Sequence, residues 1–493
     1  MIPMQDDVVK DQNLSITLAL FPLTLLIFLL GLSVYLFGSD SSYGANQIAL
    51  VMATFAAAVV GKKIGVPWSQ LQQGILNGIM IGLAPILILL AVGGLIGTWI
   101  LCGTVPSMIF YGVQILEPSM FYAASSMISA VVAVSVGSSW TVAGTLGIGL
   151  MGISTSFGLS PAITAGAIIS GAYFGDKLSP LSDTTNLASA VAGQDLFEHI
   201  KHMLWTTIPG YAVTLIILLV ISESIAASPD DIKILQENLR SEFNIGLHLL
   251  LPLILMLVLI FKRIAAYPAI VISSLFGAAF AALFQSNVAA DLANSPELSI
   301  TLATLKGIWI SLFDGFQLNS GNEFLDKLLS KGGMSSMLNT VWLIITALGF
   351  GGILEATGIL RFLIDRVLKG VTSAGNLISA TTIACLGTNA LTADQYMGIS
   401  LPGRMFKDEY EKMGLSSLNL SRTIEDSATM TSALIPWNTC GAYMSATLGV
   451  ATISYAPYAF LNWLCPLIAV SYGFLGVALK PRESNSEVSL VAK

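Results

Sequence analysis

Apolar stretches of about 20 residues recur along the whole chain, and each is long enough to cross a membrane as a helix. The uninterrupted ones run over 14–37, 45–61, 72–101, 204–224, 244–261, 264–284, 336–356 and 455–479. Only 10% of the residues are charged, 54% are hydrophobic and the mean hydropathy is +0.79, whereas soluble domains carry about 25% charged residues. The sequence therefore predicts an all-α polytopic membrane protein.

Two further apolar segments, about 160–193 and 417–449, are interrupted by polar, proline-containing centres. We interpret them as broken helices, which brings the expected total to about ten transmembrane helices. Two other segments, about 120–157 and 374–406, carry small polar residues at their middle, GSSWT and GTNALT, and are predicted to be re-entrant hairpins. A shorter helix before each hairpin, 104–116 and 358–370, is expected along the membrane surface.

The distribution of basic residues predicts the orientation of the chain. If the N-terminal segment 1–13 is cytoplasmic, fifteen Lys and Arg residues lie in cytoplasmic segments and five lie outside. The C-terminal tail, 480–493, is then also cytoplasmic. This bias supports the assignment of the spans, because an error of one helix would remove it.

The two halves of the sequence resemble each other. AVGGLIGT at 91–98 matches GFGGILEA at 349–356, and KLSPLSDTT at 177–185 matches ALIPWNTCG at 433–441. Segments 14–224 and 244–479 are therefore predicted to be inverted repeats, an arrangement in which transporters bind substrate near the membrane midplane. The segment 225–243 would connect the repeats, and a second exposed loop at about 285–335 is expected to hold a short helix.

The polar stretch FGDKLSPLSDTTN at 174–186 contains the chemistry expected of a cation site. Irregular backbone survives at membrane depth only where it lines a cavity or is satisfied by protein. Freed carbonyls and polar side chains would supply oxygen ligands for a small hard cation, from Ser179, Ser182, Thr184 and Asn186. Asp176 and Asp183 would supply negative charge, which exceeds the charge of the single nearby Lys177. A tentative Na+ site consists of Asp176, Asp183, Thr184 and Asn438.

The second broken helix and the hairpin tips add candidates. Asp426 is a possible carrier, and ion or substrate ligands are expected at Ser138, Ser139, Thr141, Thr388, Asn389, Asn438 and Thr439. Glu355 and Asp394 are further proton-carrier candidates, since carboxylates inside a membrane are usually functional. Structural alternatives remain open: hydroxyls that cap helices, an ion pair between Arg422 and Asp426 at i, i+4, an aspartate paired with Lys177, or Glu355 at the cytoplasmic interface.

Other functional classes find little support in the sequence. The four cysteines are scattered without a CxxC pair, and no nucleophile and base occur together at membrane depth, so we expect neither an enzyme nor a bound cofactor. No basic run is typical of nucleic-acid binding. The expected partners are Na+, protons and the lipid bilayer, and a homo-oligomer is left open.

The stretches GAYFGDKLSPLSDTTNLASAVAG (171–193) and EDSATMTSALIPWNTCGAYMSATLGV (425–450) resemble the signature sequences of the NhaC family of Na+/H+ antiporters. The similarity in hydropathy extends over nearly the whole chain. The resemblance to the NhaC family implies inverted repeats with paired hairpins. It also implies exchange of cytoplasmic Na+ for external H+ in a bacterial inner membrane. The polar positions of the family correspond to Asp176, Ser179, Asp183, Thr184, Asn186, Glu425, Asp426, Asn438 and Thr439.

Two functions remain open after this comparison. In the first, ions are the only cargo and one carboxylate binds Na+ and H+ competitively. In the second, the protein is a Na+- or H+-coupled exchanger or symporter of a small organic acid, of the malate and lactate type carried by relatives, or of an amino acid. Acidic residues outnumber basic ones near the expected midplane, which favours cations as the cargo.

Overall fold

The computed structural model describes residues 14–37, 41, 43–222, 229–368 and 371–482. This part of the chain is helical apart from loops and two isolated β-bridges. Seven of its helices are long and apolar enough to cross a membrane, and two bent helix pairs raise the number to as many as nine. The all-α polytopic fold is confirmed, whereas the count of about ten spans stays a prediction. Segment 1–13 and most of the tail lie outside the described residues.

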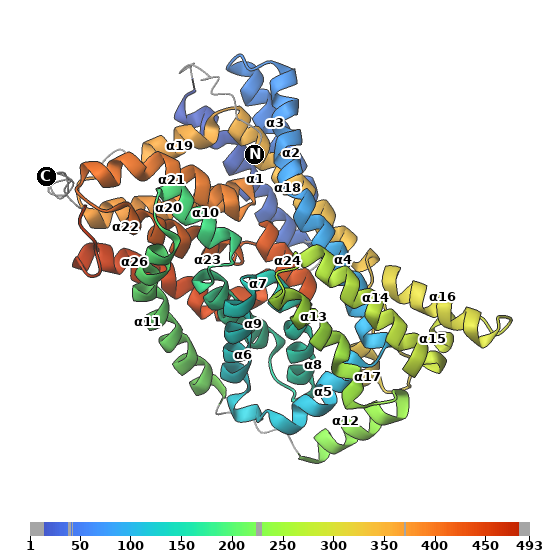
Figure 1. The fold of residues 1–493 in the computed structure, drawn as a ribbon. Helices are drawn as coiled ribbons and strands as arrows, with labels where there is room; N and C mark the ends of the chain where they lie inside the picture. The colour runs from blue at the N-terminus through green and yellow to red at the C-terminus, as the bar shows by residue number, and fades with distance from the viewer. Residues whose placement is uncertain (1–13, 38–40, 42, 223–228, 369–370, 483–493) are drawn as a thin grey trace, which may run out of the picture.

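The described residues from 14 to 242 form twelve α-helices, most of them joined by short connections (Figure 1). They are α1 (Ile16–Phe37), α2 (Ala45–Lys63), α3 (Trp68–Ile81), α4 (Leu83–Leu101), α5 (Thr104–Ile115), α6 (Phe121–Val136), α7 (Ser139–Val142), α8 (Ile148–Ser156), α9 (Pro161–Leu178), α10 (Asp183–Ala192), α11 (Leu196–Ser222) and α12 (Pro229–Glu242). A π-helical turn, Ala143–Gly147, connects α7 to α8.

The second half repeats this alternation of long and short helices. Its helices are α13 (Leu251–Phe261), α14 (Ala266–Phe284), α15 (Ser286–Ala293), α16 (Ile300–Phe313), α17 (Glu323–Leu329), α18 (Leu338–Ala356), α19 (Ile359–Leu368), α20 (Ala374–Thr392), α21 (Gln395–Lys412), α22 (Ser417–Ile424), α23 (Met430–Ser432), α24 (Thr439–Leu448), α25 (Thr452–Tyr455) and α26 (Phe460–Leu475). A π-helix, Glu425–Thr429, joins α22 to α23.

Helices begin and end where the sequence has capping residues. Ser160 accepts a hydrogen bond from the backbone N–H of Ile163 and precedes a proline at the first position of α9, which is a favourable helix start. That helix ends at Leu178, two residues before Pro180, and the next helix begins with Ser182 as its cap. The interruption predicted in 160–193 is therefore present, and a second one separates α23 from α24.

The structure differs from the predicted layout in three places. The span expected over 72–101 is divided at Gly82 into α3 and α4. The loop 285–335 contains three short helices, α15, α16 and α17, instead of one. The helix expected on the membrane surface at 104–116 corresponds to α5, most of which is buried. Glycines let α5 and α8 approach, because a Cβ on Gly152 would collide with Ile109.

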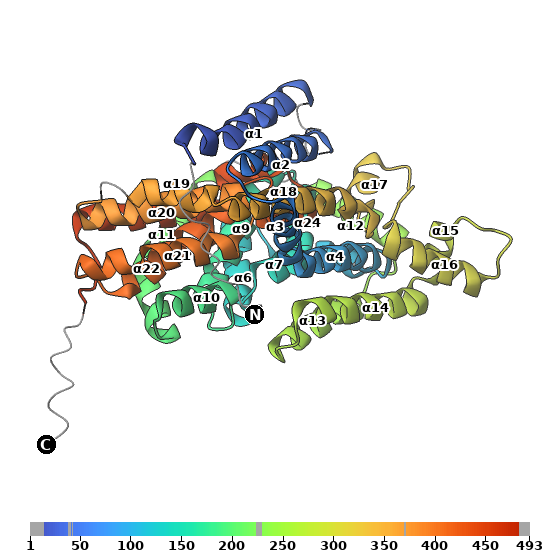
Figure 2. The same cartoon turned by 90° about the horizontal axis from the view of Figure 1, so that it is seen from above.

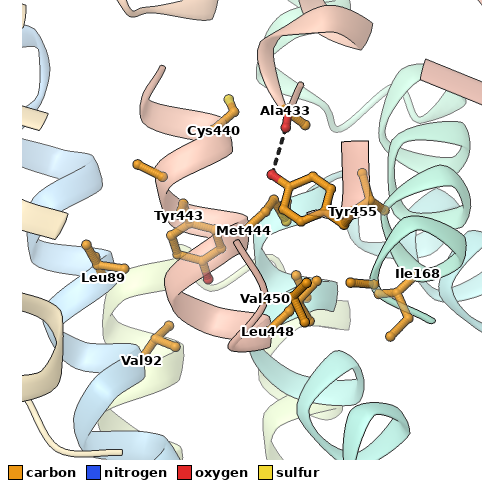
Figure 3. Packing of buried hydrophobic residues seen from close by; sticks show 14 of the residues in the cluster. Leu89, Val92, Ile168, Ala433, Cys440, Tyr443, Met444, Leu448, Val450 and Tyr455 are labelled. Carbon is orange, nitrogen blue, oxygen red and sulfur yellow. Dashed lines mark hydrogen bonds between the residues drawn. The ribbon is translucent and has the colours of Figure 1, made fainter. Parts of the chain in front are cut away.

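The interrupted helices lie in the interior of the molecule. Figure 2 shows α1 at one edge and α13 and α14 at the opposite edge, with α7, α9 and α24 between them. Helix α24 packs its apolar side chains between α4 and α9, where Tyr443 and Leu448 face Leu89, Val92 and Ile168 (Figure 3). The second break, 433–438, is buried or half-buried, whereas Pro180, Leu181 and Asp183 of the first break are exposed.

Apolar side chains on the outer helices remain exposed. Ile27 and Phe28 on α1 are 71% and 65% exposed, and Val220 on α11 is 63% exposed. Surfaces of this kind are stable when they face lipid acyl chains, since lipid tails are as apolar as the side chains. The relation between the two halves as inverted repeats stays a prediction.

Candidate functional site: a polar cavity between the interrupted helices

A cavity of about 600 Å³ lies between the tip of the first predicted hairpin and the two helix breaks. Seven of the residues predicted as ligands or carriers line it: Ser138, Thr141, Asp176, Ser182, Asp183, Thr184 and Thr439. Its remaining wall comes from α4, the turn between α13 and α14, and the start of α21. The structure thus brings residues from distant parts of the sequence to one polar space.

Asp176 is held in the cavity wall by the tip of the first hairpin. It lies in the last turn of α9 and is 8% exposed. Ser139 donates two hydrogen bonds to Oδ2 of this carboxylate, one from its backbone N–H at 3.0 Å and one from Oγ at 2.7 Å. Ser182 lies next to the same carboxylate. Asp176 is therefore a fixed, enclosed negative charge that borders the cavity.

The break between α9 and α10 satisfies most of its own backbone. Asn186 donates from Nδ2 to the carbonyl oxygens of Pro180 at 2.9 Å and Ser182 at 2.7 Å. Ser179 accepts a hydrogen bond from the N–H of Leu181 at 3.3 Å. Neither Ser179 nor Asn186 lines the cavity, so these two predicted ligands stabilise the break.

Asp183 differs from Asp176 in its exposure. It is the first residue of α10 and its side chain is exposed at the cavity, whereas a carboxylate enclosed at membrane depth was expected.

The tip of the first hairpin lies against the same break. A Cβ on Gly137 would stand 2.7 Å from Leu181. Gly137 also has φ of +71°, which favours glycine.

Behind the cavity lies a fully buried cluster of charged residues. Lys177 Nζ forms an ion pair with Oδ1 of Asp426, and both side chains are 0% exposed. Thr206 Oγ1 donates to the same oxygen at 2.9 Å. Lys177 therefore pairs with an aspartate of the second broken helix, and not with Asp176 or Asp183 of its own stretch as the alternative interpretation had it.

The ion pair between Arg422 and Asp426 that the sequence suggested does not form. Arg422 Nη1 instead donates to the carbonyl oxygen of Ala478 at 2.9 Å. Asp426 turns toward Lys177 of the other broken helix. Asp426 therefore forms its ion pair with a residue of another helix and not with a residue of its own helix.

Glu425 connects this cluster to the cavity. Its Oε1 accepts a hydrogen bond from Thr184 Oγ1 at 3.0 Å, and Thr184 lines the cavity. The Oγ atoms of Thr184 and Ser182 are also 3.0 Å apart. Glu425 and Asp426 are both buried, although they are adjacent, because residues 417–434 are buried on all sides of the helix. They open a π-helical turn, a feature that often occurs at functional sites.

The tip of the second hairpin uses its polar side chains for structure. Thr388 donates to Ala384 O at 2.8 Å, and Asn389 donates to Ala428 O at 2.6 Å. Asn438 caps α24 through the N–H of Cys440 and donates to Asn389 O at 3.1 Å. None of these three lines the cavity. The amide of Asn438 is therefore used in hydrogen bonds within the protein. Asn438 is removed from the tentative set of Na+ ligands.

Two predicted proton carriers lie on the other side of this tip. Asp394 caps α21, accepting from the N–H of Met397 at 2.8 Å. Asp394 and the half-buried Glu355 border a small hollow of about 10 Å³, which is about the space of one water molecule. They are separate from the main cavity lining.

Several lining residues were missed in the sequence. Gln395 and Tyr396 directly follow Asp394 and reach the cavity, as does Trp140 at the first tip. Trp140 stacks on Tyr443 with ring centroids 4.0 Å apart. Their position next to predicted tip residues was the available signal. No group of three or more His, Cys, Asp or Glu side chains suited to a metal ion occurs within the described ranges.

An all-helical multi-pass membrane protein with interrupted helices around a polar cavity has the architecture of a secondary transporter. The model of the Na+/H+ antiporter family matches residues 171–477. The Na+/H+ antiporter NhaC of Alkalihalophilus pseudofirmus is 39% identical over 89% of this chain and 92% of its own length. The chain belongs to the Na+/H+ antiporter family, in the NhaC group. Its relatives are antiporters and not enzymes.

Other relatives differ in what their names say they carry. The malate-2H+/Na+-lactate antiporter of Bacillus subtilis is 37% identical over 89% of this chain and 91% of its own length. The arginine/ornithine antiporter ArcD of Halobacterium salinarum is 34% identical over 98% of this chain and 97% of its own length. Family membership therefore leaves the cargo of this chain to be argued from its site.

Proposed function

We propose that this protein exchanges cytoplasmic Na+ for external H+ by alternating access, in a bacterial inner membrane. The carrier is Asp176, which binds Na+ and H+ in turn. The observation that carries this proposal is the position of Asp176 in the cavity wall, 8% exposed and held by Ser139. A carboxylate enclosed at membrane depth is costly unless it binds a cation or a proton.

The charges around the cavity support a cation as cargo. Lys177 is the nearest basic residue in the chain to Asp176, but it is paired with Asp426. The charge of Asp176 is therefore left for a mobile ion. Hydroxyl oxygens of Ser182 and Thr184 line the same space, and oxygen ligands of this type suit a hard cation such as Na+. Asp183 would attract cations at the exposed side.

The cavity also suggests which side is loaded. Arg263 belongs to the turn between α13 and α14, Tyr267 lies in the first turn of α14, and both line the cavity. The distribution of basic residues predicts that this turn is cytoplasmic. The conformation described here would then receive Na+ from the cytoplasm. The opposite opening requires movement of the hairpins against the interrupted helices, as expected of inverted repeats.

The test uses the purified protein in proteoliposomes that carry an imposed pH gradient and a pH-sensitive dye. We expect added Na+ to dissipate the gradient in the absence of any organic solute. If Na+ alone has no effect while malate, lactate or an amino acid dissipates the gradient, ions are not the only cargo and the proposal is wrong.

The size of the cavity favours a second candidate function, exchange of a small organic acid or amino acid coupled to Na+ or H+. A volume of about 600 Å³ is within the range of sites for small molecules and exceeds what one ion needs. Arg263, Trp140 and Tyr396 in its wall could bind a carboxylate and an organic body. This function predicts malate-dependent or amino-acid-dependent dissipation that is reduced in Arg263→Gln, while Lys262→Gln serves as the control.

A further inference from the structure

One oxygen of the Glu425 carboxylate has no partner. Glu425 is 0% exposed, Oε1 accepts from Thr184, and Oε2 has no hydrogen bond among the described residues. Buried polar groups are nearly always satisfied, and an unsatisfied charged one is costly. We therefore expect a cation or a proton to bind at Oε2.

Neither of the two buried basic residues near Glu425, Lys177 and Arg422, forms an ion pair with it. Lys177 forms its ion pair with Asp426. Arg422 lies three residues before Glu425, but its Nη1 donates to Ala478 O. No ion pair joins Glu425 to a basic side chain within the described ranges. The carboxylate thus lacks a neutralising partner from the protein.

A second unpartnered oxygen lies next to it. Thr429 ends the π-helical turn that Glu425 begins, and its side chain is 0% exposed. Its Oγ1 is close enough to the Glu425 carboxylate to interact with it, but it makes no hydrogen bond of regular geometry in the described part of the chain. Together with Thr184 Oγ1, these atoms form a set of carboxylate and hydroxyl oxygens, the ligand type that hard cations prefer.

We propose that Glu425, Thr429 and Thr184 form a second Na+ site, deeper than the one at Asp176. An ion would reach it from the cavity past Thr184, whose Oγ lies 3.0 Å from Ser182 Oγ and from Glu425 Oε1. The inference rests on the proposed function only in taking Na+ as the cargo. It deepens that function, because two sodium ions would then bind in each transport cycle.

Equilibrium binding of radioactive Na+ to the purified full chain in detergent tests the proposal without requiring transport. The wild type is expected to bind two ions. Glu425→Gln removes the deep site and should leave one ion. Thr429→Val keeps the shape of the side chain but removes one hydroxyl ligand, so it should weaken one of the two binding events about 10-fold. Thr214→Val is the control, since Thr214 is buried and donates only to Gly210 O.

The outcomes separate this inference from the proposed function. Asp176→Asn should remove the other ion and retain the deep one. Binding of a single ion by the wild type that is lost in Asp176→Asn and unchanged in Glu425→Gln and Thr429→Val would overturn the second site while supporting the first. The same result is expected if Glu425 holds a proton instead of Na+. If Asp176→Asn leaves Na+ binding unchanged, Asp176 is not the carrier. The deep site is then supported if Glu425→Gln loses a bound Na+ ion and overturned if it does not.

Discussion

Lys177 and Asp426 form a fully buried ion pair although 249 residues separate them in the sequence. They lie on the two interrupted helices, so the pair joins the two halves of the chain directly behind the cavity. A buried ion pair is weak evidence for stability, but breaking it by removing one partner is strongly destabilising. The pair also leaves Asp176 as a carboxylate without a basic partner, which the proposed exchange requires.

Replacement of Lys177 by methionine should strongly destabilise the protein. Asp426 would remain buried without its cation, which typically costs about 3–5 kcal/mol. The double variant Lys177→Met/Asp426→Leu should recover most of this loss, because no unpaired charge is left. Thermal unfolding of the purified protein in detergent measures both effects. Losses that simply add in the double variant would show that the two residues are not coupled.

Loss of the Ser139 hydroxyl should weaken ion binding with little effect on folding. The Ser139→Ala variant keeps the backbone N–H bond to Asp176 and removes the Oγ bond of 2.7 Å. A hydrogen bond to a charged group contributes about 1.5–3 kcal/mol, so the Na+ concentration for half-maximal exchange should rise about 10-fold or more. Ser135→Ala is a matched control, since Ser135 donates only to Val131 O. Equal exchange by the Ser139 variant and the wild type would contradict the role given to Ser139.

Alanine at Gly137 should separate the first hairpin tip from the helix break. A positive φ costs a residue with a Cβ about 1–2 kcal/mol, and the added atom would also press on Leu181 and Ser182. We expect lower thermal stability and loss of most exchange activity. Gly158→Ala isolates the backbone effect, because Gly158 has φ of +68° and nothing within 4 Å of an added Cβ. If Gly137→Ala and Gly158→Ala have the same stability and exchange activity, the contact between the hairpin tip and the helix break contributes to neither.

Phenylalanine at Tyr455 should destabilise the second interrupted helix. Tyr455 Oη donates to Ala433 O at 2.7 Å and lies 3.2 Å from Gly441 O, on the two sides of the break (Figure 3). A buried carbonyl left without a donor costs about 1–3 kcal/mol. Thermal unfolding should detect this cost, whereas Tyr35→Phe, on a side chain that is 85% exposed, should have no effect. An unchanged unfolding temperature for Tyr455→Phe would mean that water or another group satisfies the break.

The sequence predicted much of the fold because its main signals are local. Pro180 interrupts a segment that is apolar at both ends, and the break at this position was placed correctly. Ser182, predicted as an ion ligand, also caps α10. Gly82 divides a continuous apolar stretch into two helices, and Pro85 in the first turn of α4 was the available signal. The number of spans therefore could not be fixed from hydropathy.

The site was harder to predict, since it depends on which residues meet after folding. Asp176 and Thr184 line the cavity as expected, but Asn438 and Asp394 cap helices instead. The pair of Lys177 with Asp426 crosses between helices, and helical spacing indicated only partners within one helix. Glu425 and Asp426 are both buried because the helix around them is enclosed on all sides, which helical spacing alone does not predict.

The central claim is that Asp176 carries both Na+ and H+. It is tested most directly by Na+-driven proton movement in proteoliposomes that contain Asp176→Asn, with Asp183→Asn measured beside it. We predict that Asp176→Asn folds and abolishes exchange, while Asp183→Asn, exposed at the cavity, retains part of it at a higher Na+ requirement. Full exchange by a correctly folded Asp176→Asn protein would contradict the account.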